Sequence, residues 1–297
     1  MLASAPVVSV VVVNWNAGAS LDRCLASLAA AGPDTEVIVV DNASTDGSTA
    51  AATRDRPWAR VIPTAGNLGF AGGANVGAAA ACGDVLVFLN PDATVEPGAL
   101  AELVRVLVAT PEVGIAGGGL TDDDGRWQPA TARFGVVPHL LCDTTLGRLH
   151  RRGRQDVQRV DWVYGTFMAV RRSVFEQLGG FDASYFIYGE DLDLCYRARA
   201  AGWGTLSVPR ARARHGPNVS ATGRFGLARD AAVVQGELRF YRTRRGRGAA
   251  LAYRTLAAGK FALKATLAAL AGRLRTAGMA ARVVSVCLGR RAEEIAG

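Results

Sequence analysis

The first 120 residues alternate apolar runs with segments of helical periodicity, and this alternation sets the strongest limit on the fold. It is typical of βαβ units, in which helices connect parallel strands. The runs are largely continuous rather than alternating, as expected for strands covered by helices on both faces. The sequence therefore predicts an α/β fold with a mostly parallel, doubly wound sheet. Strands are expected at residues 7–13, 37–40, 61–62 and 85–89, with helices over 21–31, from about 46 and over 71–81.

This regular alternation ends after residue 119. The segment up to residue 159 contains Pro, Gly and charged residues with little periodicity, and it is predicted to be a mobile loop region. Regularity returns at Trp162. From there Ser173 is expected to cap a short helix, and residues 190–201 are expected to form a longer one.

The positive charge of the chain is concentrated at its C-terminal end. The net formal charge is +8, yet residues 238–297 hold 13 Lys+Arg against 2 Asp+Glu, which leaves 21 against 24 in the preceding part. Because the main domain has no excess of positive charge, it is not expected to bind nucleic acid. The basic C-terminal part instead favours contact with an anionic membrane surface.

Leucines in this basic part repeat at the helical period and lie within a narrow arc, while Phe261 falls on the opposite side. Two interpretations stay open, a helix packed on the protein's own core and a helix lying on a membrane surface. No 18 apolar residues run without a charge, so no transmembrane helix is expected. The leucines are Leu256, Leu263, Leu267, Leu270 and Leu274, flanked by Lys260, Lys264, Arg273 and Arg275.

Cysteine usage favours a reducing compartment. The five cysteines are scattered, with no CxxC pair and an odd total, so neither a disulfide framework nor a zinc site is suggested. The N-terminal apolar run lacks a preceding basic region and a following cleavage site, and it is interpreted as a strand rather than a signal peptide. We expect a cytoplasmic protein that is peripheral on the inner face of the membrane.

Two acidic clusters lie where a sheet of this kind binds ligands. Asn90-Pro91-Asp92 directly follows the apolar run at 85–89, and Glu190-Asp191 begins a predicted helix about a hundred residues later. Open α/β sheets bind ligands at the carboxyl ends of their strands. The two sites are expected to converge, one to hold a metal and the other to accept a proton. For the second cluster, acidic residues favoured by the helix dipole are the alternative.

Two polar loops each connect a predicted strand with a helix. Residues 41–48 offer short polar side chains that suit a base and ribose, or else form an Asx-type turn in which Asp46 caps the helix. Residues 67–75 contain three glycines that would let the backbone approach a phosphate. A dinucleotide site would need Gly-x-Gly-x-x-Gly after the first strand, where Asn14-Trp15-Asn16 stands instead.

Taken in order, these motifs resemble glycosyltransferase family 2, and most closely the rhamnosyltransferase-like branch of bacterial cell-wall and surface-polysaccharide enzymes. The motifs are VVVNWN, DNASTDGS, NLGFAGGAN, FLNPDA, WVYGTFMAVRR and GGFDASYFIYGEDLDLCYRARAAGW. The resemblance covers about residues 7–215 and implies a GT-A fold, a nucleotide-sugar donor, a divalent metal and inversion at the anomeric carbon. Residues 1–120 would form the nucleotide-sugar-binding half, 121–223 the acceptor-binding and catalytic half, and 224–297 a basic helical extension.

The resemblance also assigns roles to single residues. Asp41 matches the family's base-contacting acid, and Asn14 lies where the first strand ends beside the nucleotide. The segment with Asn67, Gly69 and Asn75 matches the part next to the ribose and diphosphate. The remaining candidates for substrate binding are Asn42, Asp46, Gly73, Asn90, Trp162 and Gly165.

The metal motif departs from the family pattern. The common Asp-x-Asp is Asn90-Pro91-Asp92 here, so an amide replaces one carboxylate. Asp92 is expected to bind Mg²⁺ or Mn²⁺ together with the donor diphosphate, water and His215. The family's Glu-Asp pair matches Glu190-Asp191, so Asp191 is the expected base for the acceptor hydroxyl and Glu190 its partner or alternative.

The leading hypothesis is an inverting glycosyltransferase that moves L-rhamnose from dTDP-L-rhamnose to a lipid-linked or polysaccharide acceptor of the cell envelope. Transfer of another sugar from a UDP donor is the second hypothesis. A protein that binds nucleotide sugar or membrane without catalysis is the third, and the Glu190-Asp191 pair argues against it. A nucleotidyltransferase would need a basic phosphate-binding signature near the first strand, which the sequence lacks.

Overall fold

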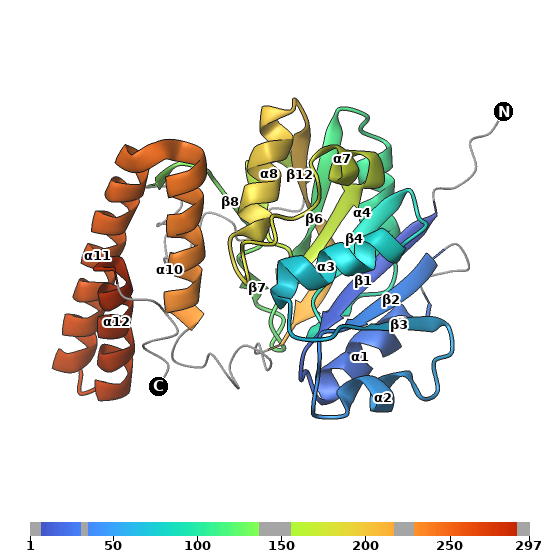
Figure 1. Ribbon diagram of the computed structural model, residues 1–297, viewed down its shortest axis with the longest axis horizontal. Coiled ribbons are helices and arrows are strands. Elements are labelled where there is room, and N and C mark those ends of the chain that lie inside the picture. The colour runs from blue at the N-terminus through green and yellow to red at the C-terminus, as the bar shows by residue number, and fades with distance from the viewer. Residues whose placement is uncertain (1–6, 31–34, 137–155, 217–228, 290–297) are drawn as a thin grey trace.

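The computed structural model describes residues 7–30, 35–136, 156–216 and 229–289 (Figure 1). Within these residues ten strands form one sheet in the order β3-β2-β1-β4-β11-β6-β12-β5, with β7 paired to β6 and β9 to β12. Strands β8 and β10 pair with each other. The strands are β1 Val8–Asn14, β2 Thr35–Asp41, β3 Ala59–Pro63, β4 Val85–Leu89, β5 Ala93–Val95, β6 Val113–Thr121, β7 Trp127–Gln128, β8 Thr131–Ala132, β9 Gln158–Arg159, β10 Trp162–Val163, β11 Phe167–Arg171 and β12 Gly204–His215.

Most strands of the large sheet run in one direction. Strand β1 is parallel to β2 and β4, and β2 is parallel to β3. Strand β11 is antiparallel to both β4 and β6, while β12 is parallel to β6. The carboxyl ends of β1, β2, β4, β6 and β12 therefore lie at one edge. This arrangement confirms the predicted α/β fold with a mostly parallel sheet.

Helices cover both faces of the sheet and bury an apolar layer on each. One layer contains α1 and α4, and the other contains α3 and α8. Ser173 does not cap α7, because it is the second residue of that helix and Arg171 occupies the cap position. The helices are α1 Ala19–Leu28, α2 Ser48–Thr53, α3 Gly69–Ala80, α4 Ala99–Val108, α7 Arg172–Gln177, α8 Glu190–Ala200, α10 Arg229–Phe240, the π-helix η1 Tyr241–Arg245, α11 Gly246–Leu270 and α12 Leu274–Cys287.

Part of the predicted mobile region after residue 119 is a hairpin. Strand β6 continues to Thr121, and β7 returns beside it with Gln128 opposite Leu120. The loop prediction is therefore wrong for residues 120–121 and 127–128, and also for the short strands at 131–132 and 158–159. Two-residue strands give no sequence signal, since two positions cannot display a hydrophobic repeat. Residues 137–155 of the same predicted region lie outside the described residues.

The C-terminal extension packs on the domain through α10 and η1, while α11 and α12 form a hairpin on the outside (Figure 1). The ring of Tyr196 in α8 contacts those of Phe134 and Phe240, each at a centroid distance of 5.3 Å, and these two rings are 6.3 Å apart. Tyr241 then stacks on Tyr253 of α11 at 4.8 Å. These rings belong to the same apolar cluster as α3 and α8. The extension thus shares the domain's core.

The leucine face of α11 is exposed. Leu263, Leu267 and Leu270 are 61%, 57% and 81% exposed. Among the described residues, every large apolar side chain that is more than half exposed lies in this extension. Helix α11 does pack on the protein's own core, which was one of the two interpretations, but through its opposite, buried face instead of through these leucines. That buried face consists of Tyr253, Ala257, Phe261 and Ala268.

The exposed face ends with α11. At Gly272 the backbone has a φ of 69° and leaves the helix, so Leu274 begins α12 instead of continuing the predicted arc. Leu274 is nevertheless 75% exposed. None of the described helices is both long and apolar enough to span a membrane.

Candidate active site

The carboxyl edge of the sheet carries four of the predicted site residues. Asn14 ends β1 directly opposite Asp41, which ends β2. Asp92 follows β4, and His215 ends β12 opposite Ala93. Parallel strand direction alone brings these side chains to one edge, as the sequence predicted.

Asn14 is fully buried and holds the loop after β2 in place. Its Nδ2 lies 3.1, 2.9 and 2.8 Å from the hydroxyl oxygens of Ser44, Ser48 and Thr49. Its Oδ1 is buried and has no hydrogen-bond partner within the described residues. Asn14 was expected to contact the nucleotide, but its amide nitrogen instead orders the loop after β2.

The loop contains the expected Asx-type turn, in which Asp46 accepts the N–H of Ser48, but the prediction that Asp46 caps the helix is wrong because Gly47 occupies the cap position of α2. Asp41 Oδ1 accepts a hydrogen bond from the backbone N–H of Ser44 at 3.0 Å. Asp46 accepts one from Ser48 and another from Gly18, both at 3.0 Å. Asp41 is only partly buried at the sheet edge. Of the two aspartates, Asp41 is therefore better placed to contact a ligand, whereas Asp46 joins two loops.

Asn42 connects the end of β2 to the start of α3. Its Nδ2 donates to Asn67 Oδ1 at 2.9 Å and to the Gly69 carbonyl at 3.0 Å. Its Oδ1 accepts the N–H of Leu68 at 2.9 Å. Because Asn42 is buried and bonded within the protein on both ends of its amide, it orders the segment around Asn67 instead of facing a ligand.

The start of α3 makes close backbone contacts that require glycine. Gly69 has a φ of 71°, and a Cβ there would lie 2.0 Å from the Phe186 carbonyl oxygen. A Cβ on Gly73 would lie 2.7 Å from Val13 Cγ1. Asn75 pairs with the backbone of Phe181 in both directions, at 2.8 and 2.9 Å. Gly73 and Asn75 thus fix the position of α3, and their place beside the ribose and diphosphate stays a prediction.

Asp92 and His215 form a buried pair. Asp92 Oδ1 lies 3.5 Å from His215 Nε2, with the two side chains 3% and 10% exposed. Asp92 Oδ2 and His215 Nε2 have no hydrogen-bond partner within the described residues. A carboxylate and an imidazole nitrogen suit Mn²⁺ or Mg²⁺. Since no three His, Cys, Asp or Glu side chains of the described chain gather at one point, further ligands would have to come from a donor or water.

Asp191 lies at the start of α8 and is partly exposed. Its Oδ2 accepts the N–H of Gly165 at 2.8 Å, and its Oδ1 accepts that of Leu192 at 2.7 Å. Burial raises the pKa of Asp191 to about 6, although these two N–H groups and the Trp162 side chain act in the opposite direction. A carboxylate with this pKa is ionised at neutral pH and still basic enough to accept a proton.

Glu190 is buried, and its Oε2 has no hydrogen-bond partner within the described part of the chain. Burial, and then the negative charge of Asp191, raise its pKa well above the usual value. The neutral acid is therefore favoured at Glu190. This difference between the two neighbours favours Asp191 as the base.

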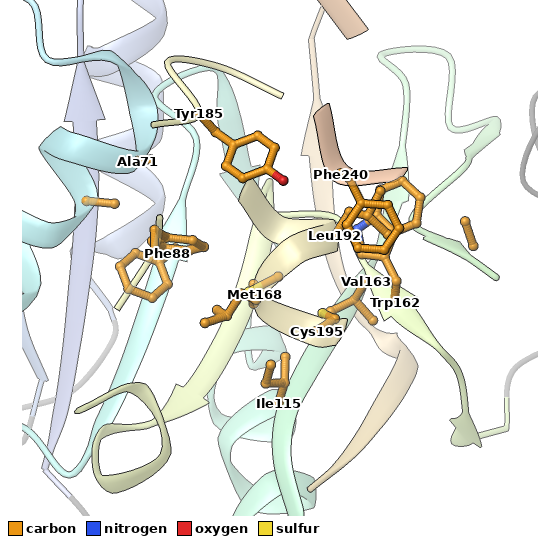
Figure 2. Close-up of a cluster of buried hydrophobic side chains, with 14 of the residues drawn as sticks. Ala71, Phe88, Ile115, Trp162, Val163, Met168, Tyr185, Leu192, Cys195 and Phe240 are labelled. Carbon is orange, nitrogen blue, oxygen red and sulfur yellow. The ribbon is translucent and has the colours of Figure 1, made fainter. Parts of the chain in front are cut away.

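Gly165 lies between α3 and α8, and Trp162 is buried in the core near Asp191. A Cβ on Gly165 would meet Phe70 of α3 and Asp191 of α8, each at 3.5 Å. Trp162 is 5% exposed. Figure 2 shows it packed among Val163, Leu192 and Phe240. Trp162 thus supports Asp191 from the core, which corrects its predicted place on the lining of the cleft, while Asn90 remains partly exposed at the edge.

Tyr188 connects the two acidic clusters and has a strained backbone. Burial raises the pKa of its phenol, Arg229 acts in the opposite direction, and the charges of Glu190 and Asp92 add smaller contributions that raise it. Its φ is 67°, a region that bulky residues rarely adopt. Gly236 in the middle of α10 lies against this residue, and a Cβ there would be 2.1 Å from the Tyr188 carbonyl oxygen. The extension therefore fixes the backbone immediately before the catalytic candidates.

Replacement of Gly236 by alanine is expected to displace this backbone and to reduce both stability and activity. Overpacking of this kind costs about 1–3 kcal/mol. Urea unfolding would measure the free energy of unfolding, and initial rates would measure turnover. Gly259→Ala is the matched control, because that glycine lies in α11 with open space around it and should gain up to about 1 kcal/mol. Equal effects of the two variants would contradict the contact.

Asp193 is fully buried in the first turn of α8. It forms ion pairs with Arg197 of the same helix and with Arg244 of η1, each at 2.6 Å. Arg197 also donates to the carbonyls of Leu178 and Gly180. The beginning of α8 is thus held by a buried carboxylate between two arginines, one of which belongs to the extension.

Sequence reasoning missed three residues of this arrangement, namely Gln128, Gly236 and Arg244. Gln128 contacts His215 from the hairpin that the sequence left as loop. A glycine inside a helix costs about 1 kcal/mol, so Gly236 carried a signal that could have indicated a close contact. Arg244 carried none, since it lies in a cluster of basic residues.

The chain is similar to characterised rhamnosyltransferases. It is 34% identical over 241 residues to the N-acetylglucosaminyl-diphospho-decaprenol L-rhamnosyltransferase of Mycobacterium tuberculosis, covering 73% of this chain and 78% of that one. It is 30% identical over 138 residues to rhamnosyltransferase WbbL of Escherichia coli, covering 44% and 52%. This agreement confirms the resemblance to the rhamnosyltransferase-like branch.

Solved structures give the same fold. The mannosyltransferase PcManGT of Pyrobaculum calidifontis, in complex with GDP-Man and Mn²⁺, superposes with a TM-score of 0.64 at 21% identity, covering 96% of this chain and 87% of that one. GalNAc-T7 with UDP, GalNAc and Mn²⁺ gives 0.58 at 21% identity, covering 72% and 44%. The model of the glycosyltransferase-like family 2 matches residues 5–243, and on this match, the fold and the relatives together, the chain belongs to that family.

Proposed function

We propose that this protein is an inverting, metal-dependent glycosyltransferase that transfers L-rhamnose from dTDP-L-rhamnose to a lipid-linked acceptor in cell-envelope glycan synthesis. The observation that carries the proposal is the arrangement of the buried Asp92–His215 pair and Asp191. Asn90, two residues before Asp92, donates its N–H to the Thr166 carbonyl at 3.0 Å, and the adjacent Gly165 donates to Asp191 at 2.8 Å, so the main chain connects the two acidic clusters. The choice of sugar and acceptor rests on the similarity to the decaprenol-linked L-rhamnosyltransferase.

Asp191 acts as the base in this proposal. The acceptor hydroxyl attacks the anomeric carbon from the face opposite the diphosphate and gives its proton to the Asp191 carboxylate. The N–H groups of Gly165 and Leu192 hold that carboxylate in one orientation. The bond between the anomeric carbon and the diphosphate breaks, and the nucleoside diphosphate leaves with the electron pair.

The donor is bound at the ends of β1, β2 and β4 in this proposal. Asp41 contacts the base, and the segment around Asn67 and Gly69 lies beside the ribose and diphosphate. Asp92 and His215 hold Mg²⁺ or Mn²⁺, which supplies positive charge next to the leaving group when it is bound. Because Asn90 is neutral, Asp92 is the carboxylate that the Asn90-Pro91-Asp92 motif offers to the metal.

A donor screen with purified protein tests this function. dTDP-L-rhamnose and a set of UDP-sugars are offered with Mn²⁺ and a short prenyl-diphosphate-linked N-acetylglucosamine. We expect product from dTDP-L-rhamnose alone, with an inverted anomeric configuration by NMR, and no product after addition of EDTA. Product from UDP-sugars alone would replace rhamnose by another sugar. Absence of both transfer and donor hydrolysis would favour a protein that binds nucleotide sugar without catalysis.

The exposed face of α11 supports a peripheral position on the cytoplasmic side of the membrane. Its leucines lie on an extension with a large excess of Lys and Arg. Of the flanking cations, Lys264 is paired with Asp230 at 3.1 Å. Arg273 and Arg275, at the junction of α11 and α12, are therefore the better candidates for contacts with anionic lipids.

Replacing Leu263, Leu267 and Leu270 together by glutamine is expected to weaken binding to anionic liposomes by at least about tenfold, since a buried leucine contributes about 1.5–3 kcal/mol. Sedimentation with vesicles measures the partition, and turnover of a short soluble acceptor should be unchanged. Trp58→Gln with Val108→Gln is the control, because these side chains are exposed on the main domain. Unchanged partition of the leucine variant would remove the membrane surface from the proposal.

A further inference from the structure

Gln128 of β7 holds both the backbone and the ring of His215. Its Nε2 donates to the His215 carbonyl oxygen at 3.0 Å, and its Oε1 lies 3.1 Å from His215 Nδ1. The first contact fixes the orientation of the amide, because only the nitrogen end can donate to a carbonyl. The oxygen end must then face the imidazole.

This orientation selects one tautomer of the ring. An amide oxygen can only accept, so the Nδ1 that faces it must carry the proton. The neutral imidazole then has its lone pair on Nε2. A hydrogen bond to one ring nitrogen determines in this way which nitrogen is free to bind a metal.

The lone pair on Nε2 faces a carboxylate. His215 Nε2 is buried without a hydrogen-bond partner within the described residues and lies 3.5 Å from Asp92 Oδ1. Two acceptors that face each other in a buried site repel unless a proton or a metal cation lies between them. Without Gln128 the ring could carry its proton on Nε2 and pair with Asp92 directly, which would occupy the nitrogen that a metal needs.

The position of Gln128 is set by the β6–β7 hairpin. Gln128 lies opposite Leu120 and Trp127 opposite Thr121, while β12 pairs with the other edge of β6. The guanidinium of Arg212 in β12 lies over the Trp127 ring, 5.2 Å from its centroid. The hairpin is thus packed against β12, the strand that ends at His215.

We propose that Gln128 is a positioning residue that keeps His215 in the tautomer with a free Nε2 and so preforms the metal-binding pair with Asp92. This inference rests on the metal-dependent function proposed above, but it makes a claim about the protein without metal. The tautomer can therefore be measured separately from metal binding and from activity.

Nitrogen NMR of histidine-labelled protein tests the tautomer. The chain has three histidines, so few ring signals are expected, and the His215→Gln variant identifies the relevant one. In mildly alkaline buffer without metal, wild-type His215 should show a protonated Nδ1 and an unprotonated Nε2. In Gln128→Leu the preference should be lost or reversed. A wild-type ring with its proton on Nε2, or on both nitrogens, would overturn the proposal, as would an unchanged tautomer in the variant.

Metal affinity gives the second readout. Mn²⁺ is titrated into protein with dTDP present and followed by electron paramagnetic resonance. Gln128→Leu should bind Mn²⁺ about 10- to 100-fold more weakly, the usual effect of removing such a partner, whereas Gln128→Glu keeps an acceptor for Nδ1 and should bind more tightly than the leucine variant. Gln177→Leu is the control, since that side chain bonds Trp203 instead of His215.

The outcomes separate this inference from the proposed function. Equal Mn²⁺ affinity in Gln128→Leu and wild type would overturn the role of Gln128 while leaving the metal site in place. A wild-type protein that binds no Mn²⁺ with nucleotide would instead overturn the metal-dependent function, whatever the tautomer of His215.

Discussion

Replacement of Asp191 by asparagine is expected to lower transfer by on the order of a hundredfold or more while donor binding is retained. Asparagine keeps the shape of the side chain, but its single oxygen can accept from only one of the two N–H groups of Gly165 and Leu192. It cannot accept the proton of the acceptor hydroxyl. Rapid-quench transfer and equilibrium donor binding would measure the two effects. Glu190→Gln is the matched control and should cost less, because the neutral acid is already favoured there. A larger loss in the Glu190 variant would move the base to that residue.

The raised pKa of Asp191 also predicts a pH profile. The base must be ionised, so kcat/KM should be full at neutral pH and fall as the pH drops through about 6. Stability changes with pH in the opposite direction to activity. The pKa of this carboxyl group rises from 3.8 to about 6 on folding, so its protonated form favours the folded state. That contribution is complete below pH 3.8 and is lost as the pH rises through about 6. Asp191→Asn removes the cost of burying the ionised group at neutral pH but also loses one N–H hydrogen bond, so its unfolding temperature should stay close to that of wild type. This result would distinguish loss of chemistry from loss of fold.

Asp92→Ala is expected to abolish detectable transfer together with Mn²⁺ binding in the presence of nucleotide. Its Oδ2 is buried and has no partner among the described residues, so its removal should cost little stability. Isothermal titration would measure Mn²⁺ binding, and thermal unfolding would show that the fold persists. Asp55→Ala, at an exposed carboxylate, is the control and should leave both quantities unchanged. Transfer at the wild-type rate by the Asp92 variant would remove this residue from the metal site.

The sequence predicted the parts of this protein that depend on local periodicity and on strand direction. Continuous apolar runs indicated β1, β2 and β4, and the parallel direction of these strands placed Asn14, Asp41 and Asp92 at one edge. The helix that begins with Glu190 and Asp191 was also predicted within one residue at its C-terminal end. Short-range patterns sufficed here because each element has its own repeat.

Contacts between distant segments could not be predicted in this way. Gln128 and His215 are 87 residues apart, and Asp193 and Arg244 are 51 residues apart. Neither pair leaves a pattern in one sequence, because a glutamine in a short hairpin and an arginine among other arginines look like ordinary surface residues. The leucine arc was recognised, but periodicity gives the width of a face and not its orientation. Only the packed structure shows that Phe261, on the opposite side, faces the core.

The contact between Gly236 and Tyr188 has a consequence for exchanging parts among related enzymes. Chimeras that join the catalytic domain of one glycosyltransferase to the C-terminal part of another treat the two as separable modules. In this chain the boundary of such a module cannot lie before α10, because α10 and η1 hold the backbone and the buried Asp193 next to the base. A junction after Arg245 would keep those contacts, but the exchanged hairpin would still have to cover Tyr241 as Tyr253 does here. The surface to which the enzyme binds can thus be changed without changing its chemistry only by substitutions after Arg245.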